Sequence, residues 1–321
     1  MKRNPSIFRK FTRLKFVVAL LVSSTLFSMT SCDNDDDEET PAPQTITDIV
    51  VNTADFSLLE AAVVRAGLAE ALRTGSLTVF APTDAAFKTA GFADVAAINA
   101  APVATLQAVL QYHVIGQRTA AADIPTAANT AVQTLGNSNV YITKTASGVS
   151  VNGAQVTQAD VPASNGVIHV INKVLMPPTQ NIVQLAQGNP NLSLLVAAVT
   201  RGGAPVLNAL TAAGPLTVLA PTNAAFQAAG FADAAAINAA PVATLTNILT
   251  YHVIAARAFS TNLTNGAAVP TAQGTTVRSN VSSSGVSFLG TGNANQASNV
   301  VSADNVATNG VVHVIDRVLL P

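Results

Sequence analysis

The chain of 321 residues carries 16 basic and 17 acidic residues, a single cysteine and no tryptophan. Its net charge of −1 provides no basic surface that follows a phosphate backbone, so composition excludes nucleic acid as a main partner. One cysteine allows no internal disulfide and no thiolate metal site. Stability must therefore come from hydrogen bonding and from burial of the aliphatic side chains that dominate the composition.

The N-terminal segment has the pattern of an export signal. Six basic residues precede an apolar run at 16–27 that is too short for a membrane-spanning helix. Cys32 follows Ser28-Met29-Thr30-Ser31, and this placement resembles a bacterial lipobox. The resemblance implies a lipoprotein signal peptide at 1–31 and lipid attachment at Cys32. The alternative is an ordinary cleaved signal peptide that leaves a free thiol.

An acidic block follows the cysteine at once. Residues 33–39 contain six carboxylates and one asparagine, which must stay solvated and extended, so we expect an acidic flexible linker at 32–44. A cysteine followed directly by acids also resembles the surface-export signal of Bacteroidota lipoproteins. This implies a lipid anchor in the outer membrane with the protein exposed at the cell surface, although the sequence leaves open whether the anchor faces the periplasm or the exterior.

The rest of the chain is an internal repeat. The stretch 77–87 returns as 216–226, and Tyr-His-Val and Gly-Val-Ile/Val-His-Val-Ile motifs also occur twice. The repeat predicts two domains, at 45–177 and 178–321, each of the size that one hydrophobic core supports. All four histidines of the chain lie inside the repeated motifs.

The first part of each repeat has helical spacing. Leu58, Leu59, Ala62 and Val63 form an apolar stripe that stops at Gly67. We expect the helix to resume at 68–72, and we expect the second copy to match it with segments at 192–200 and 206–210. Each domain is thus predicted to open with a broken helical hairpin.

A strand and a capped helix come next. The β-prone run at 77–80 must end at Ala81-Pro82, because proline lacks the backbone donor of a central strand. Thr83 and Thr222 are predicted N-caps of the following helix, whose Phe87 and Phe226 face inward. Asp84 favours the positive helix end, whereas Asn223 takes its place in the second copy.

The rest of each repeat is predicted to contain two more helix starts, then a hairpin, then a final strand. Asp94 and Asp233 are expected to be further N-caps, and Pro102 and Pro241 mark helix starts. Alternating patterns predict hairpins over 140–151 and 277–289. Asn-Gly turns lead into last strands at 167–175 and 311–320, which are apolar on both faces and hence central.

The motifs Thr-Val-Phe-Ala-Pro-Thr-Asp-Ala-Ala-Phe, Tyr-His-Val and Asn-Gly-Val-Ile-His-Val-Ile-Asn, in this order, resemble the fasciclin (FAS1) domain. The resemblance covers the chain from about residue 45 to its end. It implies an α+β fold of two tandem FAS1 domains, each a β-sheet wedge or sandwich with helices packed against it. It also implies a non-enzymatic role in adhesion and matrix organisation, with matrix or cell-surface proteins or polysaccharides as partners.

The resemblance also suggests partner-binding positions. In some animal relatives an Asp followed by an apolar residue, just before the last motif, takes part in receptor binding. The matching positions are Asp160 with Val161, and more loosely Asp304 with Val306, because Asn305 intervenes. The alternative for Asp160 is a structural one, in which it caps a turn before Pro162.

The remaining motif residues carry no evident chemistry. His113, His169, His252 and His313 invite a two-histidine metal site, but no carboxylate stands at ligand spacing. With Tyr112 and Tyr251 they are expected to be structural, and the histidines to be buried, neutral and hydrogen-bonded between the helical and strand halves. Hydrolase signatures, a P-loop and a nucleophilic cysteine are missing from the sequence, so we expect no catalysis, metal or cofactor.

Three functions remain open at this point. The first is a surface-anchored adhesion or interaction protein. The second is a glycan-capture accessory lipoprotein of a carbohydrate-uptake system, and the third is a structural spacer without a ligand of its own. Differences between the copies, such as Asp84 against Asn223 and Asp160-Val161 against Asp304-Asn305-Val306, mark where a partner-specific surface is to be sought.

Overall fold

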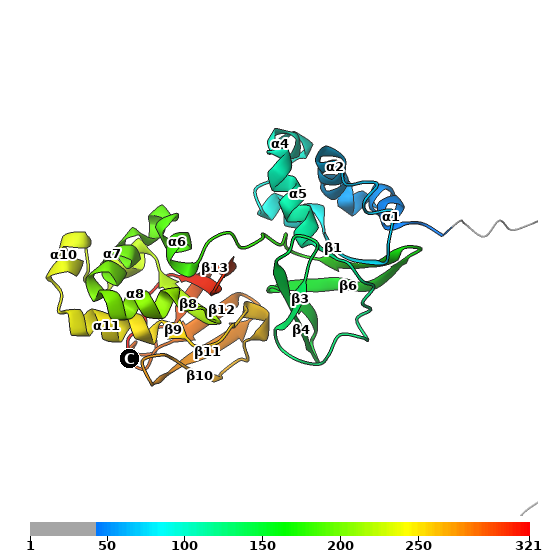
Figure 1. Cartoon of the computed structure of the whole chain (residues 1–321). Coiled ribbons are helices and arrows are strands. Elements are labelled where there is room, and N and C mark those ends of the chain that lie inside the picture. Colours follow the sequence, from blue (N-terminus) through cyan, green and yellow to red (C-terminus); the bar gives the residue numbers. More distant parts are fainter. Residues whose placement is uncertain (1–42) are drawn as a thin grey trace, which may run out of the picture. The chain divides into compact units, whose positions relative to one another are not determined.

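A computed structural model describes residues 43–321, which form one compact unit. The expected signal peptide, Cys32 and most of the acidic linker lie outside the described residues. The unit contains two seven-stranded sheets, and each sheet has its own set of helices. Figure 1 shows the helices of each domain gathered on one side of its strands. We call the elements α1 to β7 domain 1 and the elements α6 to β14 domain 2.

The order of elements is the same in the two domains apart from two additional helices in domain 2, α8 and the short 3₁₀ helix η3 (Ser260–Asn262). Each domain also has a 3₁₀ helix after its first α-helix, η1 (Ala54–Phe56) or η2 (Pro190–Leu192). Domain 1 consists of α1 (Ile46–Asn52), α2 (Ser57–Ala66), β1 (Leu77–Pro82), α3 (Asp84–Thr89), α4 (Val95–Ala100), α5 (Val103–Tyr112), β2 (Val114–Ile115), β3 (Thr130–Gln133), β4 (Asn139–Thr145), β5 (Gly148–Val151), β6 (Ala154–Ala163) and β7 (Gly166–Ile171). Domain 2 consists of α6 (Ile182–Gln187), α7 (Ser193–Gly202), α8 (Ala204–Thr211), β8 (Leu216–Pro221), α9 (Asn223–Ala228), α10 (Ala234–Ala239), α11 (Val242–Tyr251), β9 (Val253–Ile254), β10 (Ala268–Pro270), β11 (Thr276–Ser282), β12 (Gly285–Leu289), β13 (Ser298–Ala307) and β14 (Gly310–Ile315).

The last strand of each domain lies in the middle of its sheet. Domain 1 has the strand order β2-β1-β7-β6-β5-β4-β3, and domain 2 has the equivalent order. The first and last strands pair in parallel, with Val79 opposite Ile168 and Val218 opposite Val312. A parallel pair needs a long crossover, which the helices α3 to α5 and α9 to α11 begin. All six residues of β7 and of β14 are buried, so the prediction of central final strands is confirmed.

Each domain has two hydrophobic clusters, because successive side chains of a strand point to opposite faces of the sheet. In β1, Val79 and Ala81 pack among the helices, where Phe87 and Leu106 also lie. Phe80 points to the other face and packs against strands β4 and β5. Domain 2 repeats this division. The expectation of two α+β domains, each a sheet with helices packed against it, is confirmed.

The predicted helix caps are confirmed. Thr83 and Thr222 each accept a hydrogen bond from the backbone N–H three residues later, and Asp94 and Asp233 do the same for α4 and α10. Pro102 and Pro241 precede the first residues of α5 and α11. These features were predictable because a cap involves only neighbouring residues.

Asp84 and Asn223 also bind the backbone of a second helix, which comparison of the two repeats did not predict. Asp84 Oδ1 accepts from Leu58 N at 2.9 Å, and Asn223 Oδ1 accepts from Leu194 N at the same distance. Each side chain therefore also closes the N-terminal end of a neighbouring helix, α2 or α7. An amide oxygen serves this purpose as a carboxylate does, which explains why the charge is exchangeable.

The predicted helical hairpin is present in domain 2 but wrong for domain 1. Domain 1 forms turns at 69–73, whereas domain 2 forms α8. The chain has three fewer residues between Gly67 and Leu77 than between Gly203 and Leu216, which leaves less room for a helix.

No single helix among the described residues is long and apolar enough to cross a membrane. Only the bent pair of segments 190–202 and 204–211 is long and apolar enough when the two are taken together.

Two other boundaries differ from expectation. The short helices α1 and α6 were not predicted, although Thr45 with Asp48 and Asn181 with Gln184 form capping boxes at their starts. The final strands end at Ile171 and Ile315, earlier than predicted. Beyond these points one backbone N–H in each domain, that of Leu175 or Leu319, donates to Nε2 of His113 or His252.

Candidate functional site

The penultimate strand of each domain contains a bulge at the predicted aspartate. The pairing register shifts between Gln158 and Val161 in β6 and between Ser302 and Asn305 in β13, and these intervals contain Asp160 and Asp304. Asp160 has φ 58° and Asp304 has φ 61°. This left-handed conformation is uncommon for residues other than glycine, but aspartate is one of the side chains that tolerate it. The two bulges are therefore equivalent features of the fold.

A histidine of the neighbouring strand fixes each bulge. The backbone N–H of Asp160 donates to Nδ1 of His169, and that of Asp304 donates to Nδ1 of His313, both at 3.2 Å. The Nε2 atoms lie 3.0 and 2.8 Å from backbone carbonyl oxygens. Because a carbonyl only accepts, Nε2 carries the proton and both rings are neutral. These histidines hold the backbone of the aspartate.

In domain 1 the aspartate side chain is exposed. Asp160 Oδ1 accepts from Ala121 N at 2.8 Å, and this bond joins residues 39 positions apart. The prediction that Asp160 caps a turn before Pro162 is therefore wrong, because the carboxylate bonds to a distant segment. Val161 packs against the helical core and is only partly exposed. The carboxylate is thus the principal feature that this bulge presents to solvent.

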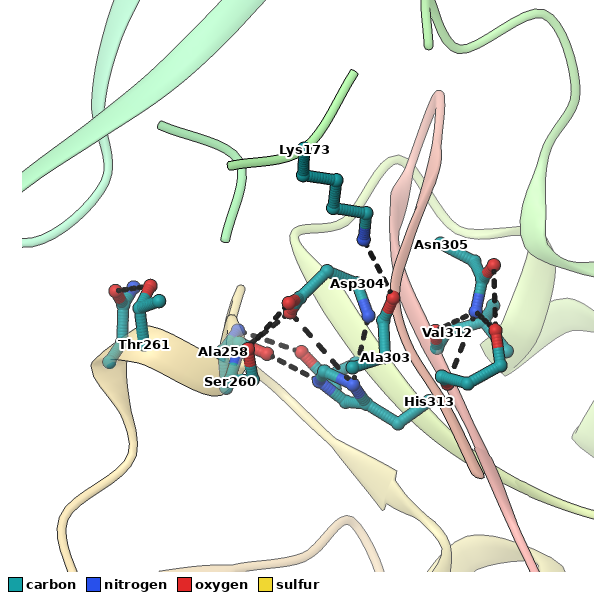
Figure 2. Close-up of polar contacts among 12 residues, drawn as sticks. Lys173, Ala258, Ser260, Thr261, Ala303, Asp304, Asn305, Val312 and His313 are labelled. Atoms are coloured by element: carbon teal, nitrogen blue, oxygen red, sulfur yellow. Dashed lines mark hydrogen bonds and ion pairs between the residues drawn. The ribbon is translucent and has the colours of Figure 1, made fainter. Parts of the chain in front are cut away.

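In domain 2 the equivalent side chain is buried. Asp304 accepts from the backbone N–H of Ser260 at 2.7 Å and from its hydroxyl at 2.5 Å. Its Oδ1 also lies 4.0 Å from Nδ1 of His313 (Figure 2). Burial lowers the pKa of His313, and the Asp304 charge only partly opposes this effect. Asp304 is therefore a buried carboxylate with two strong donors.

Two residues of domain 1 cover Asp304. Lys173 Nζ donates to the carbonyl of Ala303 at 2.9 Å, as Figure 2 shows. Burial lowers the pKa of Lys173, and the Asp304 carboxylate opposes the shift. Gly153, with φ +79°, packs so closely on the Asp304 carboxyl group that a Cβ atom there would collide with it. The bulge of domain 2 is thus part of a contact between the domains.

The segment that binds Asp304 also contacts the sheet of domain 1. Asn129 Nδ2 donates to the carbonyl of Arg257 at 2.6 Å. The Arg257 guanidinium lies 3.9 Å from the centre of the Tyr141 ring, a cation–π arrangement. The hydroxyls of Ser150 and Thr261 are 2.9 Å apart. We call this segment, residues 257–262, the junction loop.

The looser match of Val306 to Val161 is wrong. Val161 pairs with Ile168 next to the central strand, and the residue at that register in domain 2 is Asn305, opposite Val312. Val306 occupies the register of Pro162. Asn305 Nδ2 donates to the carbonyl of Val312 at 3.0 Å (Figure 2). The second copy therefore lacks the apolar neighbour that Val161 provides in domain 1.

The other two histidines join each helical half to its strand half. His113 Nδ1 donates to the carbonyl of Val109 at 2.7 Å, and Nε2 accepts from Leu175 N at 2.9 Å. His252 makes the same two bonds in domain 2, at 2.8 and 3.0 Å. Burial lowers the pKa of both histidines to about 4. Their nitrogens are thus already engaged within the protein.

The aromatic motif residues are also packed inside. Phe87 and Phe226 are buried, each with an edge-to-face aromatic neighbour. The hydroxyls of Tyr112 and Tyr251 donate to backbone carbonyls at 2.8 Å. Within residues 43–321 no three His, Cys, Asp or Glu side chains lie together in a way that suits a metal ion. The motif residues thus have structural partners in both domains.

Sequence reasoning named the two aspartates but missed their surroundings. Nothing local points to Gly153 or Lys173, which meet Asp304 only after the domains fold. One usable signal was present, since an aspartate precedes a strand histidine by nine residues in both copies. The same spacing between two polar residues in both copies indicates that the two residues are hydrogen-bonded to each other in each domain.

Comparison with known proteins agrees with this architecture. The family model described as the fasciclin domain matches residues 54–177 and 190–321. The chain belongs to the fasciclin family. Transforming growth factor-beta-induced protein ig-h3 from Sus scrofa is 30% identical over 250 residues, which cover 77% of this chain and 35% of that protein. The chain thus spans about a third of this relative.

Bacterial FAS1 proteins are also similar. Protein sll1483 from Synechocystis sp. is 38% identical over 154 residues, covering 47% of this chain and 79% of that protein. Among solved structures, the FAS1 domain pair of the insect cell adhesion molecule fasciclin I has a TM-score of 0.41 and 19% identity, and covers 82% of this chain and 96% of its own. The two matches to the family model, at residues 54–177 and 190–321, show that the chain contains two tandem FAS1 domains.

Proposed function

We propose that this is a non-enzymatic, surface-anchored adhesion protein that binds a partner protein through the exposed bulge of domain 1. One observation carries the proposal. The same bulge is open to solvent at Asp160 and closed at Asp304 by Gly153 and Lys173. A feature that recurs in both domains, but is used internally in only one, leaves the other copy for an external partner.

The geometry of Asp160 suits recognition. His169 holds its backbone and Ala121 N binds Oδ1, so the carboxylate is already ordered before a partner arrives. Ordering a side chain in advance reduces the entropic cost of association. The exposed side chain keeps Oδ2 for an arginine, lysine or backbone N–H of the partner.

The surface favours a protein partner over a polysaccharide. The chain has no tryptophan, and Tyr112 and Tyr251 are buried. Tyr141, the third tyrosine, lies beneath the Arg257 guanidinium. No aromatic side chain among residues 43–321 is exposed, so the described surface offers no aromatic platform for sugar rings. This supports adhesion over glycan capture.

A crosslinking experiment tests the site. A photoreactive amino acid replaces Gln158, which lies beside Asp160 on the exposed side of β6, or its counterpart Ser302 in domain 2. The full-length protein is displayed on cells and irradiated with the natural surroundings present. We expect protein adducts from position 158 and at least fivefold fewer from position 302. Equal yields would contradict a domain 1 site, and adducts that survive protease but not glycosidase would favour glycan capture.

A pair of substitutions tests the carboxylate itself. Asp160→Asn removes the charge but keeps the oxygen that accepts from Ala121, whereas Asp55→Asn makes the same change at another exposed aspartate. We expect Asp160→Asn to reduce adhesion of the displaying cells, and the crosslinked yield at position 158, at least fivefold. Asp55→Asn is expected to change neither. Unchanged adhesion in both variants would leave the spacer function as the better description.

The anchor is a separate part of the proposal. The lipobox-like sequence at Cys32 and the acids after it support attachment to the outer membrane, with the two domains held at the cell surface. Fractionation of cells that carry Cys32→Ala tests this, together with mass spectrometry of the N-terminal peptide. We expect the variant to leave the membrane fraction and to lack acyl chains. Retention of the variant in the membrane would overturn lipid anchoring without affecting the Asp160 site.

A further inference from the structure

We propose that domain 2 also binds a small apolar ligand, a single hydrocarbon chain of about twelve carbons. The site is a pocket of about 310 Å³ bounded by α6, α7, α8 and α11. These helices are labelled together in domain 2 of Figure 1. The pocket is separate from the bulges, and the inference does not depend on the proposed adhesion function.

The interior of the pocket is almost entirely apolar. Its wall includes Ile182, Leu195, Val199, Leu210 and Leu249. His252 also borders it, but both of its ring nitrogens are bonded to backbone groups of domain 2. Water needs two or more polar partners to stay in a buried site, and this wall does not supply them. The part of a ligand that enters must therefore be uncharged and apolar.

The volume of the pocket and the polarity of its rim indicate the kind of ligand. An apolar cavity of about 150 Å³ in another protein binds benzene, and a pocket about twice as large accommodates about twelve carbons. Four of the wall residues are exposed and form the rim, namely Gln187, Thr200, Ala204 and Leu207. The open side carries two hydrogen-bonding side chains. A linear chain with a polar end at the rim fits this distribution.

Domain 1 shows how the same fold closes this space. The equivalent pocket there has about 90 Å³. Val50 stands where domain 2 has Ala186, and Leu68 follows Gly67 where Ala204 follows Gly203. These two changes remove carbon atoms from the wall in domain 2. The large pocket thus results from smaller side chains together with α8, which takes the place of the turn of domain 1.

A polar contact also closes the pocket of domain 1. Thr47 Oγ1 donates to the carbonyl of Ala69 at 3.1 Å, which ties α1 to the turn after α2. Val183 stands at the position of Thr47 and cannot make this bond, and α8 replaces the turn. An empty apolar pocket is costly because its wall lacks contacts, so an apolar occupant stabilises the domain.

Binding is tested with dodecanoic acid and its methyl ester on the purified full-length protein, after a lipophilic resin has removed carried-over lipids. We expect one bound molecule per chain by native mass spectrometry and a raised melting temperature. The acid and the ester should bind with similar affinity, because no charged residue lines the pocket. Affinity is expected to rise from octanoic to dodecanoic acid and to level off by hexadecanoic acid. Absence of saturable binding for all of these probes would overturn the proposal.

A matched pair of double variants assigns the binding to this pocket. Ala186→Val with Ala204→Leu installs the residues of domain 1, and we expect dodecanoic acid to bind at least tenfold more weakly, because about five added carbons fill the space. Ala235→Val with Ala243→Leu makes the same changes at exposed positions of α10 and α11 and should bind as the parent does. Equal affinity of both double variants would overturn the site.

A third variant guards against a folding defect. Leu207 is exposed at the rim, so Leu207→Gln removes an apolar contact with the ligand without disturbing the core. We expect at least threefold weaker binding with an unchanged circular dichroism spectrum. If the first double variant fails to fold, unchanged binding by Leu207→Gln rejects the pocket.

Discussion

The two domains place the same aspartate in opposite environments. Asp160 and Asp304 share a left-handed backbone, a bulge and a histidine that accepts from the aspartate N–H at 3.2 Å. Asp160 is exposed and accepts one backbone bond, whereas Asp304 is buried and accepts from both the backbone and the hydroxyl of Ser260. The local geometry is thus independent of burial, which depends on the neighbouring domain.

This difference shows how one repeated feature can lie in two environments. The histidine and the bulge fix an aspartate on an interior strand of the sheet in both copies. In domain 2 this bulge meets Gly153 and Lys173 and forms part of the contact between domains. In domain 1 the bulge is exposed. The same local structure therefore serves as an internal contact in one copy and as free surface in the other.

The largest expected effect is on the buried aspartate. Asp304→Ala leaves the Ser260 donors unpaired and the half-buried Lys173 without a nearby carboxylate, so we expect the free energy of unfolding to fall by about 3 kcal/mol. Asp160→Ala removes one exposed bond and should cost about 1 kcal/mol or less. Urea unfolding of the full-length protein, followed by circular dichroism, measures both. Equal losses would show that burial does not distinguish the two sites.

Acid should destabilise both domains, and domain 2 more. The pKa values of His113 and His252 are about 4 in the folded protein, against about 6.5 in the unfolded chain. Their stabilising effect is complete above pH 6.5 and is lost as the pH falls toward 4, because the unfolded state binds protons first. At pH 5 the loss is about 2 kcal/mol per histidine. His313, whose pKa is also lowered, adds to the loss in domain 2.

Urea midpoints at pH 7 and pH 5 test this dependence. His113→Gln and His252→Gln should each lower stability at pH 7 but reduce the further loss between the two pH values. The two variants are expected to act alike, since the bonds of the two histidines are the same in both domains. A wild-type midpoint that does not change between pH 7 and pH 5 would contradict the assignment of neutral buried histidines.

The smallest expected change in stability comes from the hydroxyl of Ser260, which bonds to Asp304 and has no counterpart at Ala121. Ser260→Ala gives domain 2 the residue that domain 1 has at position 121, and loss of the hydroxyl bond to Asp304 should cost about 1 kcal/mol. Ala121→Ser adds a hydroxyl near the exposed Asp160 and should change stability by less than about 0.5 kcal/mol. Thermal unfolding of the two single variants gives the comparison. A larger effect of Ala121→Ser would reverse the proposed order.

The accuracy of the sequence predictions depended on the distance between interacting residues. Thr83, Asp94 and the hairpin at 140–151 were predicted correctly because the partners are neighbours in the sequence. The segment 68–72 was misassigned, because its apolar spacing suits a helix while the short connection to β1 does not. Asp160 was named as a site residue, but its bond to Ala121 joins parts of the chain that only the fold brings together.

The sequence by itself determined the repeat, the helix caps, the central strands and the family, because these follow from local periodicity and from motifs that occur twice. Only the tertiary structure decided that Asp160 is exposed while Asp304 is buried, and that the pocket of domain 2 is larger than the equivalent pocket of domain 1. Both outcomes depend on side chains that are distant in sequence and meet at short range. Burial is a property of the packed neighbours of a residue, and one or two small substitutions among them are enough to change it.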